Sequence, residues 1–481
     1  MTRQANKWLV LCVTALGALF STINASSIAI ANPVLAAEFS LTQNDVQWVT
    51  TLYLIIVTAL TLLAGRIGDR IGSNRVYITG LVVFTLGSLA CSLAGTLVLL
   101  LIGRSVQAIG AAMVLATGMG LVSSVFPPQQ RGMGIGLMVL MVGLGNTIGP
   151  PLGGFILANG SWPLIFFINV PMGVVSVALA IAWLRFTGRP QRDKEPLDLL
   201  GSVLLAALIA ALIVSMNGRF AGSIWFLAVV VLLLPLFIIV ERRHTAPLLD
   251  FVLLRNRRFS IGNLITLFSY SAMMAVSFQL PFFLQDIWHL SVDVAGFLMM
   301  VMALSMGITA PLAGILSDRV GALRVMPPAL VLSVVAQALA LFFVPEPSLP
   351  LFIVYMALIG CGMGILNTPN NSEVMAAAGR EKSGYASGFV AANRNLAFCL
   401  GTAVSAGLFS LMSGAGTLVG AAAPDVGQLL SAFKGIALLA LVLTTASALL
   451  SIYLLLRERH SPTKPDSSTP AGPDSSNEPR G

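Results

Sequence analysis

The chain alternates long apolar runs with short polar segments. A helix needs about 20 residues to cross the hydrocarbon core of a bilayer, and fourteen runs meet that length. They lie at 8–32, 47–65, 76–95, 98–125, 133–158, 164–184, 198–216, 223–241, 260–285, 294–316, 325–344, 349–371, 384–411 and 434–456. The alternating segments of about 10 residues that are typical of a membrane β-barrel are missing from the pattern. We therefore predict an all-α membrane protein with fourteen transmembrane helices.

Composition supports the bilayer as the solvent for most of the chain. Hydrophobic residues make up 57% of the 481 residues and charged residues 10%, whereas a soluble chain has about 25% charged residues. The signatures HExxH and GxSxG and a nucleotide-binding loop are absent from the sequence, and its three histidines are scattered. We expect no enzyme and no cofactor.

The basic residues predict the orientation of the helices. If the N-terminus is cytoplasmic and the spans alternate, 23 of the 27 Lys and Arg residues fall on the cytoplasmic side, as the positive-inside rule requires. Topology thus explains the net charge of +8, and no nucleic-acid partner is needed. The first apolar run has no cleavage pattern, which favours a retained first helix. We predict a multi-pass protein of the cytoplasmic (inner) membrane with both termini cytoplasmic.

The four cysteines predict no special chemistry. Cys12, Cys91, Cys361 and Cys399 all fall within apolar runs, without CxxC spacing. We expect small packing residues, no disulfide and no metal site.

One charged turn occurs twice. Residues 65–75 read GRIGDRIGSNR, and residues 314–324 read GILSDRVGALR, with Gly, Asp, Arg, Gly and Arg in the same register. An ordinary cytoplasmic loop needs only Gly to turn and Arg to satisfy the positive-inside rule, and it would not repeat all five positions. The repeat therefore indicates two similar halves. The Asp and Arg side chains can pair with each other or with neighbouring helix ends. The predicted latch residues are Gly65, Asp69, Arg70, Gly72, Arg75, Asp318, Arg319 and Arg324.

Further motifs accompany the first turn. The fourth run contains RSVQAIGAA, the fifth contains GNTIGPPLGG, and FFINVPMG follows. With the turn at 65–75, these motifs resemble the major facilitator superfamily, and specifically its fourteen-helix branch of drug:proton antiporters. The resemblance covers about residues 8–457 and implies two pseudo-symmetric six-helix bundles plus a linking helix pair. The expected domains are 1–190, 191–245 for the linking pair, 246–460, and a disordered cytoplasmic tail at 461–481.

The resemblance also assigns roles to residues. Arg104 and Gln107 of the fourth run would line a cavity and take part in proton transfer, although neighbouring carbonyl groups could instead hold a structural arginine. The glycine-rich helix would pack closely and bend; its residues are Gly145, Gly149, Pro150, Gly153 and Gly154. Arg394 is a second charge within a span, and either substrate contact or packing fits it.

The sequence departs from this branch in the first helix. Antiporters of the branch usually have an acidic residue where this chain has Asn24. No Asp or Glu lies in the middle of a predicted span, so a transported proton would need an end-of-span carboxylate such as Asp69 or Glu373. Arg104, Asn24 and Ser27 would give a cavity that favours neutral or anionic substrates.

The sequence therefore predicts a secondary active transporter that works by alternating access. We expect it to export small amphipathic compounds, as a proton-coupled multidrug pump. The alternative is an exporter of a neutral or anionic metabolite or lipid with altered or no proton coupling. A channel fits less well, because it would not need two latched halves. The expected partners are the bilayer, a small-molecule substrate and protons, and we expect a monomer.

Overall fold

A computed structural model describes residues 7–127, 131–184, 198–216, 223–244, 250–343, 348–379, 383–413 and 426–460. These residues form helices throughout. The helices are α1 (Lys7–Glu38), α2 (Gln43–Ile71), α3 (Ser73–Ser92), α4 (Leu97–Val125), α5 (Arg131–Asn159), α6 (Pro163–Phe167), α7 (Asn169–Leu184), α8 (Leu199–Met216), α9 (Ser223–Arg243), α10 (Phe251–Arg255), α11 (Arg257–Phe282), the π-helix η2 (Phe283–Ile287), α12 (Val292–Val320), α13 (Ala322–Phe343), α14 (Leu349–Ala378), α15 (Ser383–Ser413) and α16 (Val426–His460).

Each of the fourteen predicted spans coincides with a helix, α6 and α7 together forming the sixth. Helices are expected because backbone polar groups in lipid must be satisfied within the segment. Within the described ranges, eleven helices are long and apolar enough to cross a membrane. Helices α2 and α8 contribute shorter apolar stretches, at Asp45–Thr61 and Leu200–Leu212. The predicted all-α membrane fold is confirmed.

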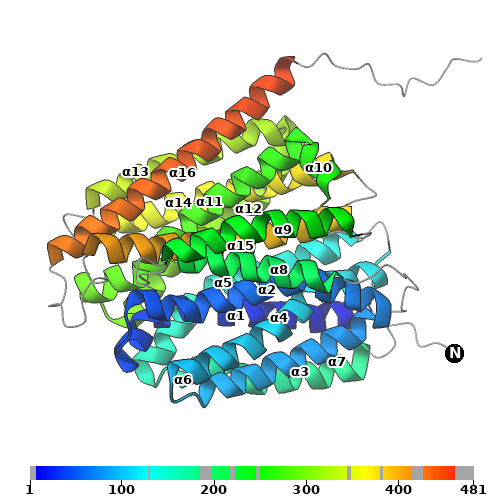
Figure 1. Cartoon of the computed structure of the whole chain (residues 1–481), viewed down its shortest axis with the longest axis horizontal. Coiled ribbons are helices and arrows are strands. Elements are labelled where there is room, and N and C mark those ends of the chain that lie inside the picture. Colours follow the sequence, from blue (N-terminus) through cyan, green and yellow to red (C-terminus); the bar gives the residue numbers. More distant parts are fainter. Residues whose placement is uncertain are drawn as a thin grey trace, which may run out of the picture.

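The helices form two bundles (Figure 1). In the first, α3 packs on α4 and α5 on α1; in the second, α13 packs on α14 and α15 on α11. Helices α8 and α9 pack on each other, and α8 also contacts α2 and α15, one helix from each bundle. The predicted domain boundaries at 190/191 and 245/246 and the tail 461–481 lie outside the described residues, so the predicted domains stay predictions.

The repeated charged turn has the same backbone geometry in both bundles. Gly72 has φ 101° and Gly321 has φ 93°, a left-handed region that favours glycine. The Gly72 amide donates to the Gly68 carbonyl and the Gly321 amide to the Ser317 carbonyl, both at 2.9 Å. The repeat seen in the sequence is therefore a repeat of backbone structure.

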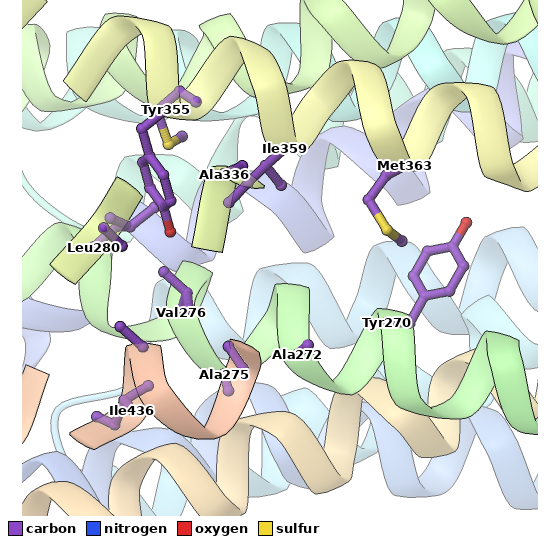
Figure 2. Packing of buried hydrophobic residues seen from close by; sticks show 14 of the residues in the cluster. Tyr270, Ala272, Ala275, Val276, Leu280, Ala336, Tyr355, Ile359, Met363 and Ile436 are labelled. Atoms are coloured by element: carbon purple, nitrogen blue, oxygen red, sulfur yellow. The ribbon is translucent and has the colours of Figure 1, made fainter. Parts of the chain in front are cut away.

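The core of the second bundle is built by α11, α13, α14 and α16 (Figure 2). Small residues of α11, such as Ala272 and Ala275, are almost fully buried and allow α16 to approach. The Tyr270 ring leaves α11 towards Met363 of α14 (Figure 2). Close packing of this kind fixes which side chains of α11 face the neighbouring helices.

We call the side with the start of α1 and the end of α16 the terminal face, and the other side the far face (Figure 1). The two bundles are in close contact near the far face. A Cβ on Gly154 of α5 would lie 2.7 Å from the Val292 carbonyl oxygen, and one on Gly296 of α12 would lie 2.6 Å from that of Pro150. Nearer the terminal face, a Cβ on Gly143 or Gly307 of the same helices would meet nothing within 4 Å. Helices α5 and α12 are thus in backbone contact near the far face, and these two glycines nearer the terminal face face open space.

A second contact completes this far-face seal. Phe278, Phe282 and Ala406 of the second bundle share a buried cluster with Leu35 of α1 and with Val46 and Val49 of α2. Gln285 donates through Nε2 to the Ile30 carbonyl at 3.4 Å. The bundles are therefore arranged with the far face closed.

Candidate functional site

A buried polar cluster surrounds Arg104 of α4. Its Nε donates to the Val49 carbonyl at 2.9 Å, and Nη1 donates to Asn24 Oδ1 at 3.0 Å and to Gln107 Oε1 at 2.6 Å. Gln107 Nε2 in turn donates to Ser88 Oγ at 2.7 Å. The structure thus brings together three residues that the sequence analysis selected separately: Asn24, Arg104 and Gln107.

Aromatic faces stabilise the guanidinium of Arg104. Its Cζ lies 4.2 Å from the ring centroid of Tyr53 and 5.8 Å from that of Phe166, distances at which the ring quadrupole attracts a cation. Within the described residues, no carboxylate pairs with Arg104, whose exposed fraction is 0%. Burying a charged arginine side chain costs several kcal/mol unless other groups compensate for its lost hydration. Amides, a carbonyl and two rings supply that compensation here.

The cluster keeps two unused donors. Arg104 Nη2 and Asn24 Nδ2 are both buried without a hydrogen-bond partner. Such groups are costly inside a protein and indicate a site that another arrangement or a ligand completes. The residues are enclosed by α1, α2 and α4 in this conformation, so their exposure to a cavity stays a prediction.

Arg394 of α15 lies in a similar setting in the second bundle, but is half-buried. It interacts electrostatically with Tyr270 of α11, and the Tyr270 and Phe398 rings are 5.6 Å apart in an edge-to-face contact. The neighbouring Asn393 donates through Nδ2 to the Asn263 carbonyl at 2.8 Å. Each bundle therefore places an arginine beside a tyrosine and amide side chains.

The glycines of α5 serve two interfaces. Gly145, Gly149 and Gly153 face α1, where Ser26 Oγ donates to the Gly145 carbonyl at 3.1 Å and Ser27 Oγ to the Gly149 carbonyl at 2.8 Å. On its other side, α5 meets α12 through Pro150 and Gly154. Ser27 is thus a helix-packing contact in this conformation.

An equivalent seam in α15 was missed by the sequence analysis. Ser271 Oγ donates to the Ala397 carbonyl at 3.1 Å, Ser405 Oγ donates to the Ala275 carbonyl at 2.6 Å, and a Cβ on Gly401 would lie 2.4 Å from the Ser271 carbonyl oxygen. The spacing of four between Ala397, Gly401 and Ser405 is the signal that could have predicted it.

The charged side chains of the second turn lie at the surface. Asp318, Arg319 and Arg324 are exposed, and none of them forms an ion pair with another described residue. The latch at this turn therefore stays a prediction. The Asp69 side chain lies outside the described part of the chain.

Two further acidic sites lie near the terminal face. Glu373 pairs with Arg258 Nη1 at 3.8 Å, and Arg258 Nη2 also reaches Glu458 at 3.9 Å. The sequence analysis overlooked Asp198 and Glu241, which are 1% and 0% exposed. A Cβ on Gly201 would lie 2.6 Å from an oxygen of each.

The four cysteines are free thiols. Among the described residues, no group of three or more His, Cys, Asp or Glu side chains could hold a metal ion.

Comparison with known proteins decides the family. The Major Facilitator Superfamily profile matches residues 14–402 and 264–478. The chain belongs to this superfamily. It is 38% identical over 409 residues to the riboflavin transporter RibZ of Clostridioides difficile, which covers 84% of this chain and 88% of that protein. It is 30% identical over 408 residues to the multidrug resistance protein Stp of Mycobacterium tuberculosis (strain CDC 1551 / Oshkosh), covering 82% of this chain and 74% of that protein.

Solved structures share the fold of this superfamily member at low identity. A bacterial homologue of the lysosomal transporter Spinster, inward-facing and unoccupied, has a TM-score of 0.66, 16% identity and coverage of 95% and 99% of the two chains. A mutant of the peptide transporter POT, in complex with sulfate, has a TM-score of 0.67, 17% identity and coverage of 94% of each chain. The chain is therefore a multi-pass membrane transporter of small molecules, in a family that is generally not enzymatic.

Proposed function

We propose that this transporter moves an uncharged or anionic planar heteroaromatic metabolite, of which riboflavin is the example to test first. The observation that carries the proposal is the buried Arg104 cluster, which offers unused N–H donors and a tyrosine ring but no described carboxylate. Donors of this kind suit carbonyl and ring-nitrogen acceptors on a flat ligand, and the rings suit its faces. The relative RibZ, a riboflavin transporter, supports the same substrate class.

The mechanism follows from the arrangement of the bundles. The far face is sealed where Gly154 of α5 and Gly296 of α12 meet the opposite backbone, and Gly143 and Gly307 nearer the terminal face face open space. With the terminal face in the cytoplasm, as the basic residues suggest, this conformation would open inwards. Rocking of the two bundles would then expose the site alternately to each side.

Export of drugs is the second candidate. Stp is a multidrug resistance protein, and a 26%-identical relative from Streptomyces glaucescens, over 410 residues and covering 83% of this chain and 76% of that protein, is the tetracenomycin C resistance and export protein. Proton coupling would have to use a carboxylate outside the Arg104 cluster, because Asn24 does not titrate. Glu373 is the described candidate that the sequence selected.

Transport by proteoliposomes separates these candidates. Radiolabelled riboflavin and the cationic dye ethidium are each offered with and without an imposed pH gradient. Movement of riboflavin and not of ethidium supports the proposal. Transport of ethidium alone would refute the proposal in favour of cation export. Transport that does not depend on the pH gradient would rule out proton coupling.

A further inference from the structure

A second polar site lies away from the arginine clusters, at the far-face end of the second bundle. A small pocket there is lined by Gln279, Phe282, Phe283, Asp286, Phe409 and Phe433. These residues come from four elements, α11, η2, α15 and α16.

The pocket contains a buried donor without an acceptor. Gln279 is 1% exposed, and its Nε2 has no hydrogen-bond partner. Asp286 lies at the rim and is exposed. A ligand that accepts a hydrogen bond at the floor and donates one at the rim would satisfy both groups.

The walls of the pocket are aromatic. Phe283 and Phe433 stack with ring centroids 4.5 Å apart and an interplanar angle of 26°. The segment from Phe283 to Ile287 is a π-helix, a rare local widening that is frequent at functional sites. Flat aromatic walls favour a flat aromatic ligand.

The pocket is joined to the far-face seal. Phe282 lines the pocket and also belongs to the buried cluster that contains Leu35, Val46 and Val49 of the first bundle. Separation of the bundles at the far face would therefore uncover one wall of the pocket. In the present conformation, the first bundle covers the pocket on the side of Phe282.

We propose that this pocket is a far-face subsite for the planar substrate, used when the far face is open. The inference rests on the proposed function and extends it. Gln279 Nε2 donates to a carbonyl or ring nitrogen of the ligand, the phenylalanines contact its ring, and Asp286 accepts from a hydroxyl group on its side chain. The chemistry selects an uncharged heteroaromatic compound with a polyhydroxylated substituent.

Kinetics from the two sides of the membrane test this assignment. The full chain is reconstituted, and riboflavin uptake is measured in vesicles sorted by orientation, so that substrate meets either the far face or the terminal face. Gln279→Leu removes the donor, and Gln279→Glu removes it with less change of shape. Gln337→Leu is the matched control, because Gln337 of α13 is also buried (2% exposed) with an unpartnered amide oxygen but does not line this pocket.

We expect both Gln279 variants to raise the far-face KM roughly tenfold, the effect of one lost buried hydrogen bond, with less than a twofold change in the terminal-face KM. Asp286→Asn should raise the far-face KM for riboflavin. It should leave the KM for lumiflavin unchanged, because lumiflavin lacks the hydroxylated chain. Equal changes of KM at both faces, or the same far-face KM in the Gln279 variants and in Gln337→Leu, would overturn the assignment of the subsite. Absence of riboflavin transport by the wild-type chain would instead refute the proposed function.

Discussion

Gly296→Ala should shift the transporter towards its far-face-open conformation. The added Cβ would lie 2.6 Å from the Pro150 carbonyl oxygen, whereas ordinary contacts begin at 3.4 Å. Backbone atoms cannot move aside as a flexible side chain can, so α12 must move away from α5. The clash exists only while the far face is sealed, and it therefore penalises one conformation.

The size of the effect follows from the cost of overpacking. An extra methyl group in a close-packed interface costs about 1–3 kcal/mol. A penalty of that size on one of two states changes their ratio by roughly 5- to 150-fold. Only the difference in this free-energy cost between the two conformations matters, because a cost shared by both would not shift their equilibrium.

Cysteine labelling measures this shift. Ala406 lies in the far-face seal and is 0% exposed, so Ala406→Cys, in a chain without the four native cysteines, reports opening through its reaction with a membrane-impermeant maleimide. Labelling should rise severalfold in Gly296→Ala. Gly307→Ala on the same helix is the control, since its Cβ would meet nothing within 4 Å. Equal labelling of the two variants would refute the assignment of Gly296 to the seal.

Three further changes probe other parts of the molecule. Asn24→Asp places a carboxylate where Asn24 Oδ1 now lies 3.0 Å from Arg104 Nη1; the new ion pair should lower riboflavin transport at least tenfold in a vesicle uptake assay, and unchanged uptake would show that the cluster does not bind substrate. Gly401→Ala puts a Cβ 2.4 Å from the Ser271 carbonyl oxygen and should destabilise the second bundle by about 1–3 kcal/mol, seen as a lower thermal midpoint than that of Gly143→Ala. Asp69→Asn should nearly abolish transport with normal membrane insertion, and wild-type uptake in this variant would rule out the latch.

The sequence predicted the parts of this fold that depend on local pattern. Apolar length alone predicted where the helices lie, because a lipid environment allows few other structures. The register of the two charged turns predicted their equivalence, and Gly72 and Gly321 indeed share a left-handed backbone. The glycines of α5 were also found from their spacing.

Contacts between distant helices were harder to predict. Asp198 precedes α8 and Glu241 lies near the end of α9, so alternating spans place both at the same face. That both side chains approach Gly201 depends on how α8 and α9 are rotated about their axes, which the sequence does not indicate. The partners of Asp318 were equally hard to predict, because an ion pair depends on which helix ends the fold brings next to the turn.

Helix α8 contacts α2 of one bundle and α15 of the other, and this placement affects how a compound dissolved in the membrane can enter the transporter. A lipophilic compound that dissolves in the bilayer could reach the space between the bundles laterally, along the lines where they meet. On the side of α2 and α15, α8 and its partner α9 cover that line. We therefore expect lateral entry from the membrane to be confined to the opposite side, between α5 and α12, so that the linking pair makes access from the bilayer one-sided.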